Sequence, residues 1–67
     1  MTGAELRRIR LKLGLRQAAF AGELAISGAY GYQMISGMER GHRTISAKTA
    51  RIAELLEQIH DLKELAS

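Results

Sequence analysis

Apolar residues recur every three or four positions along the chain, which is the spacing of one face of an α-helix. Capping residues and glycines divide this pattern into four predicted helices, with no predicted strand. Thr2 followed by Glu5 is a capping signature and Gly14 is a C-terminal stop, so the first helix is predicted at about residues 3–13. The fold class predicted is all-α, in a single compact domain over residues 1–67.

The second and third helices lie on either side of a glycine-containing segment. The second is predicted at residues 17–24. Ser27 can cap the third, but glycines weaken its first turn, so its well-formed part is predicted between residues 30 and 39, with Gly41 as its stop. The inward positions of these two helices are Phe20, Ala21, Leu24, Ile35 and Met38.

The last helix is predicted at about residues 46–65, with Ser46 as its cap, and it carries an apolar seam of coiled-coil spacing. A body of three short helices cannot cover a helix about 30 Å long. The first half, through Leu56, is therefore expected to pack on the domain's own core, and the remaining seam is expected to bind a second copy. The predicted dimer interface consists of Leu55, Ile59, Leu62 and Leu65.

Charge is sorted along the chain. Residues 1–51 carry a net charge of +6 and residues 52–67 carry −3, within a total of +3. A basic block of this kind is typical of a surface that faces a polyanion. The acidic residues of the last helix are expected on its exposed face, where they keep the dimer soluble and away from DNA; they are Glu54, Glu57, Asp61 and Glu64.

Composition argues against several other classes of protein. There is no cysteine, the two histidines stand 18 residues apart, and no phosphate-binding loop follows a strand, so we expect no enzyme, metal site, cofactor or small-molecule ligand. No apolar run has the length of a membrane span or the form of a signal peptide, so we expect a cytoplasmic protein without membrane contact.

Two segments, residues 13–21 and 35–41, resemble the helix-turn-helix family of lambdoid phage repressors and Cro proteins, which includes many small bacterial regulators (Xre-type, Cro/C1-type). The resemblance extends over residues 5 to about 56. It implies a four-helix, lambda-repressor-like DNA-binding domain with its recognition unit at residues 15–41.

In that family the third helix reads bases in the major groove. Gln33 matches a base-reading glutamine by its position relative to Ile35, and its amide can pair with adenine in a bidentate way. The alternative for Gln33 is a solvent-exposed side chain that contacts nothing. The residues assigned to base reading are Gln33, Ser36, Tyr32 and Tyr30.

Other positions are assigned to the DNA backbone or to the fold. Gln17, at the start of the second helix, matches a phosphate-contacting glutamine of the family. The remaining expected phosphate contacts are Arg16, Arg40, His42 and Arg43. The counterparts of Arg10 and Glu39 form a partly buried ion pair in the family, so these two residues are interpreted as structural.

The chain also departs from the family. The segment from Gln17 to Glu39 is about four residues longer than usual, and the insertion falls within residues 26–32. The extra residues either lengthen the third helix at its start or form a glycine-rich loop. Arg16 replaces the usual small hydroxyl cap. Gly37 replaces a long polar residue, which weakens the third helix but could permit the close approach of a phosphate.

The sequence therefore predicts a sequence-specific, double-stranded DNA-binding transcriptional regulator, namely a repressor acting as a homodimer on a pseudo-palindromic operator. The alternative is a protein-interaction module, such as an antitoxin or an adaptor, whose working surface for a protein partner is the apolar seam of the last helix.

Overall fold

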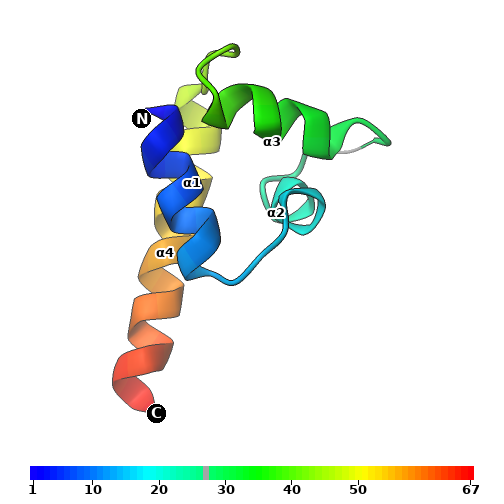
Figure 1. The fold of residues 1–67 in the computed structure, drawn as a ribbon. Coiled ribbons are helices and arrows are strands. Elements are labelled where there is room, and N and C mark those ends of the chain that lie inside the picture. Colours follow the sequence, from blue (N-terminus) through cyan, green and yellow to red (C-terminus); the bar gives the residue numbers. More distant parts are fainter. Residues whose placement is uncertain (27) are drawn as a thin grey trace.

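The computed structural model describes residues 1–26 and 28–67, and over these residues it contains four α-helices and no strand (Figure 1). The helices are α1 (Gly3–Lys12), α2 (Gln17–Glu23), α3 (Gly31–Glu39) and α4 (Ala47–Ala66). The predicted all-α class is confirmed, and each helix begins and ends within one residue of its predicted bounds. The predicted cap at Ser27 lies outside the described residues.

Side-chain caps define the starts of the first and last helices. The Thr2 hydroxyl oxygen accepts a hydrogen bond from the backbone N–H of Glu5 at 3.1 Å, and Ser46 Oγ accepts one from the N–H of Thr49 at 3.2 Å. Arg16, before α2, makes no capping bond, as expected from the loss of the hydroxyl residue. The short helix α2 therefore depends on its packing.

Three of the helices end in the same way, with a residue in the left-handed conformation and a hydrogen bond that spans six residues. Glycine occupies this position after α1 and α3, where Gly14 has a φ of 72° and Gly41 a φ of 83°. After α2 the residue is Ala25, with a φ of 60°, and the N–H of Ile26 donates to the Ala21 carbonyl at 2.9 Å. An alanine in this conformation costs about 1 kcal/mol relative to glycine.

The core lies between α1, α2, α3 and the first half of α4. At Gly31, α2 and α3 approach so closely that an added Cβ would stand 2.9 Å from the Ala21 Cβ. The fully buried side chain on α4 is Ala53, which the apolar seam did not predict. The buried residues are Leu6, Ile9, Phe20, Ala21, Leu24, Ile35, Met38 and Ala53, and the apolar residues packed against them are Leu13, Leu15, Ile26, Ile45, Ile52 and Leu56.

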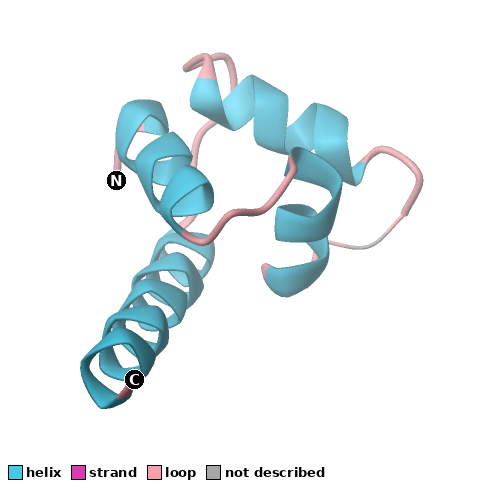
Figure 2. Ribbon diagram, turned by 60° about the horizontal axis from the view of Figure 1, so that its bottom comes forward, coloured by secondary structure: helices cyan, strands magenta, loops and turns pink. Residues whose placement is uncertain are grey.

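The second half of α4 extends beyond the other three helices, as Figures 1 and 2 show. The molecule is accordingly elongated, with extents of 36 × 22 × 18 Å. Along the extended part, the exposed fraction rises from 40% at Leu55 through 50% at Ile59 and 65% at Leu62 to 83% at Leu65. No helix in residues 1–26 or 28–67 is long and apolar enough to cross a bilayer.

Two acidic residues of α4 face α1, contrary to the prediction that all four lie on the outward face. Arg8 Nη1 lies 2.6 Å from Glu57 Oε2, and Lys12 Nζ lies 2.7 Å from Asp61 Oδ1 and 3.1 Å from Glu57 Oε2. Hydrogen bonds from Arg8 and then Lys12 lower the pKa of Glu57 to about 2. The prediction was wrong because the pattern of α4 alone does not reveal that α1 packs along this side.

Outside residue 27, the segment between α2 and α3 forms a loop and not an additional helical turn. Gly28 has a φ of 106°, its carbonyl accepts the N–H of Gly31 at 3.3 Å, and α3 begins only at Gly31. Tyr30 therefore precedes α3 and is 69% exposed. Of the two predicted outcomes for the insertion, the described residues have the loop.

Candidate nucleic-acid interface

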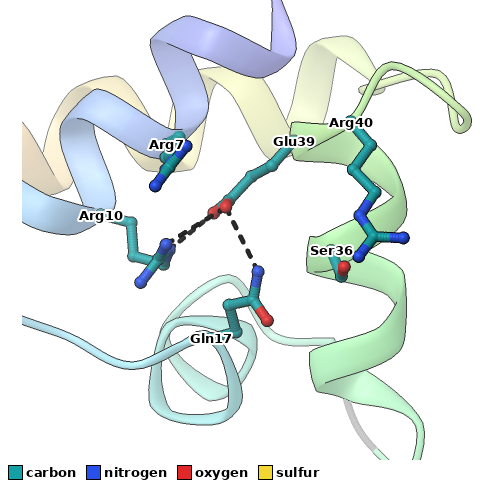
Figure 3. A pocket seen from close by; sticks show the side chains of 6 residues that line it. All are labelled: Arg7, Arg10, Gln17, Ser36, Glu39 and Arg40. Carbon is teal, nitrogen blue, oxygen red and sulfur yellow. Dashed lines mark hydrogen bonds and ion pairs between the residues drawn. The ribbon is translucent and has the colours of Figure 1, made fainter.

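A partly buried ion pair fixes α3 against the rest of the domain. Arg10 Nε donates to Glu39 Oε2 at 2.6 Å, and Arg10 Nη2 donates to Glu39 Oε1 at 3.2 Å (Figure 3). The two side chains are only 12% and 6% exposed. Arg10 Nη1 also donates to the Leu15 carbonyl at 3.0 Å, so that one guanidinium connects α1, the loop after it and α3.

Gln17 completes this arrangement from α2. Its Nε2 donates to Glu39 Oε1 at 3.3 Å (Figure 3). One amide hydrogen is thereby used within the protein, which leaves the second available to another acceptor. The residue assigned to phosphate contact thus also orients α2 against α3.

The two faces of α3 differ in character. Ile35 and Met38 are buried, as predicted. On the opposite face Tyr32 and Gln33 are exposed, and Gln33 Nε2 donates to the Tyr32 hydroxyl oxygen at 3.2 Å. One hydrogen of the Gln33 amide is used in this bond, which leaves its carbonyl oxygen and second N–H available to another molecule.

A shallow depression of about 290 Å³ runs along the exposed side of α3. No carboxylate lines it. It brings together six of the residues predicted for base or phosphate contact and adds Gly37 of α3. Its lining is Gln17, Tyr32, Gln33, Ser36, Gly37, Arg40 and His42. Among the predicted contacts, Arg16, Tyr30 and Arg43 are not part of this lining.

Next to the depression is a notch of about 280 Å³, whose lining is Arg7, Arg10, Gln17, Ser36, Glu39 and Arg40 (Figure 3). Arg10 neutralises Glu39, whereas Arg7 and Arg40 form no ion pair within the described part of the chain. The notch therefore presents two unneutralised guanidinium groups from different helices. Sequence reasoning missed Arg7, although it stands one helical turn before Arg10 and so lies on a neighbouring part of α1.

Gly37 makes room for Arg43. A Cβ at Gly37 would stand 3.0 Å from Arg43 Cδ and 3.3 Å from its Nε, so the Arg43 side chain lies directly over the helix. The N–H groups of His42 and Arg43 both donate to the Gly37 carbonyl, at 2.8 and 3.2 Å. The glycine expected to permit close approach of a phosphate thus permits close approach of an arginine, which holds Arg43 beside the C-terminal turn of α3.

Among the described residues, no group of three or more His, Cys, Asp or Glu side chains is arranged to hold a metal ion. The two linings combine amide, hydroxyl, phenol, imidazole and guanidinium groups with the carboxylate of Glu39. These groups recognise other molecules by hydrogen bonding and charge.

Comparison of the chain with models of protein families, with curated proteins and with solved structures found no match.

Proposed function

We propose that the chain is a transcriptional regulator that binds double-stranded DNA by placing the exposed face of α3 in the major groove. The observation that carries this proposal is the carboxylate-free depression along α3, whose lining combines Gln33 and Ser36 with Gln17 and Arg40. The amide and hydroxyl groups are suited to base edges, and the arginine is suited to a phosphate.

The buried Arg10–Glu39 pair supports the same proposal. A helix can read base edges only if its tilt and rotation in the groove are fixed. Arg10 and Gln17 hold Glu39 near the end of α3 at 2.6–3.3 Å, and Ile35 and Met38 anchor the buried side. The reading face is therefore preorganised before any ligand is present.

The charge around the face also suits a polyanion. Arg7 and Arg40, which form no ion pair among the described residues, line the notch beside the depression, and Arg43 lies over Gly37. Each phosphate that such groups neutralise releases counterions, which makes the affinity fall as salt rises. We assign Arg7 to this set together with Arg40 and Arg43.

The proposed working form is a homodimer that represses by occupying a promoter. Two copies would read half-sites about 34–36 Å apart, in successive major grooves of a pseudo-palindrome. The feature that supports a dimer is the row of exposed aliphatic side chains on the extended part of α4, which are 40–83% exposed.

The experiment is selection of sites from random duplex DNA, followed by titration of the selected and a scrambled duplex. Gln33→Ala is expected to reduce the preference for the selected site by about tenfold, because it removes a bidentate base contact. The matched control is Gln58→Ala, an exposed glutamine on α4. Arg7→Ala is expected to weaken binding to both duplexes equally. It is also expected to reduce the slope of log affinity against log salt concentration by about the contribution of one phosphate contact.

Two results would contradict the proposal: wild-type protein without sequence preference, or a Gln33→Ala variant that keeps the preference in full. Either result would favour the second candidate function, which is a protein-interaction module such as an antitoxin or an adaptor. That candidate is favoured by the exposed aliphatic row on α4 alone. It predicts a partner protein whose binding is insensitive to Gln33.

A further inference from the structure

A second apolar surface lies beside α4, on the side that faces α2. It is a groove of about 170 Å³, and Leu13, Leu15, Leu56 and Ile59 form its apolar wall. Glu23, at the end of α2, and Lys63, in the last turn of α4, also line it. Ile59 belongs both to this groove and to the exposed row on α4, so the two surfaces are continuous.

Glu23 and Lys63 line the same groove but do not bind each other. Neither forms an ion pair or a side-chain hydrogen bond within the described residues, and both are exposed. His60 of α4 also lines the groove, and its Nε2 lies 3.7 Å from Glu64 Oε1. The groove therefore has an acidic group on one element and a basic group on another, each without a partner.

We infer that the groove and the exposed row of α4 together receive the α4 helix of a second copy of this chain, with Glu23 of each copy paired to Lys63 of the other. This inference rests on the homodimer of the proposed function and specifies how it is built. An isologous contact repeats every interaction twice, so one unpaired Glu23 and one unpaired Lys63 per chain give two complementary pairs per dimer.

The apolar spacing fits antiparallel helices. Leu55, Ile59, Leu62 and Ala66 are separated by four, three and four residues, a pattern that reads the same in both directions. Two antiparallel copies therefore place Leu55 against Ala66 and Ile59 against Leu62, and Leu65 lies next to this seam. In this orientation the side of α4 that carries Leu56 and Lys63 faces the same side of its counterpart, which brings Lys63 toward the groove and Glu23 of the other chain.

The test is a charge reversal read out as molecular mass in solution, without DNA, by sedimentation equilibrium. Glu23→Lys and Lys63→Glu are each expected to weaken the dimer by about tenfold or more, because each places like charges opposite one another. An equimolar mixture of the two single variants is expected to dimerise again, since in the mixed dimer both contacts join opposite charges. The double variant is expected to dimerise as the wild type does.

Matched controls separate this effect from a general effect of charge. Glu54→Lys and Lys48→Glu change the net charge by the same amounts at exposed positions outside the groove, and they are expected to leave the dimer intact. Far-UV circular dichroism of every variant verifies that the helices are retained.

Each outcome bears on a different statement. If the wild type dimerises but the mixture of single variants does not recover, the groove pairing is overturned and the homodimer stands. If the wild type is a monomer, the inference is overturned together with the dimeric form of the regulator, while DNA reading by Gln33 is judged by its own titration. If the controls dissociate as readily as the groove variants, the specific pairing is likewise overturned.

Discussion

Replacing Glu39 by glutamine keeps the size of the side chain but removes the charge that balances Arg10. In the structure Glu39 accepts three hydrogen bonds, two from Arg10 at 2.6 and 3.2 Å and one from Gln17 at 3.3 Å. In the variant, the guanidinium of Arg10 has no carboxylate partner, although the Arg10 side chain is only 12% exposed. Breaking one partner of a buried pair costs about 3–5 kcal/mol, because the other charge remains desolvated.

That loss is large for a chain of this size. A stability of about 0.05–0.15 kcal/mol per residue amounts to roughly 3–10 kcal/mol for the whole domain. We therefore expect Glu39→Gln to unfold at a temperature at least about 12 °C lower than the wild type, taking about 4 °C per kcal/mol as the smallest shift for a domain of this length. The measurement is thermal and urea unfolding followed by circular dichroism.

Two further variants make the reasoning refutable. Asp61→Asn breaks an exposed pair with Lys12, whose side chains are 49% and 37% exposed, and is expected to cost less than about 1 kcal/mol. The double variant Arg10→Met, Glu39→Leu removes both charges and is expected to be more stable than Glu39→Gln. If the free energy of unfolding of Glu39→Gln lies within about 1 kcal/mol of the wild-type value, the pair does not hold α3 in place.

Two other predictions concern stability. Ala25→Gly is expected to raise the free energy of unfolding by about 1 kcal/mol, because Ala25 has a φ of 60° and glycine adopts this conformation without steric cost. Urea unfolding measures the gain. A loss of stability would argue against a left-handed residue at the end of α2. Glu57 is expected to make stability depend on acid: since its pKa is lowered from 4.5 to about 2, its contribution is complete above about pH 4.5 and is lost as the pH falls toward 2. Because Arg8 is 56% exposed and solvent screens the pair, that contribution is small. Urea unfolding of Glu57→Gln should show a smaller loss of stability between pH 5 and 2 than the wild type shows, and an equal loss would contradict the assignment.

Local signals explain why the helices were predictable. Thr2 and Ser46 cap their helices through bonds to residues three positions on, and Gly14 and Gly41 adopt the conformation that ends a helix. Such interactions involve only neighbours in the sequence, so they can be recognised in the sequence itself. The exposed and buried faces of α3 were predictable for the same reason, since they follow helical periodicity.

Features that depend on packing between distant segments were not predictable in this way. The pairing of Glu57 with Arg8 requires knowledge of which side of α4 contacts α1, and a pattern of exposed-looking carboxylates does not contain it. Arg7 joins Arg40 in one notch because α1 and α3 meet there, although the two residues are far apart in the sequence. The path of the inserted residues was left open because glycine permits both a helical turn and a loop.

The contacts that hold α4 against α1 also bear on which operators the proposed dimer would accept. Arg8 and Lys12 bind Glu57 and Asp61 about midway along the helix, so the extended part continues a helix that is fixed to the domain carrying α3. The angle between two reading helices would then be a property of the protein and not of the DNA. One base pair added between half-sites turns them relative to each other by about 35°, and a regulator built on such stiff arms would reject that operator even if every base it contacts were unchanged.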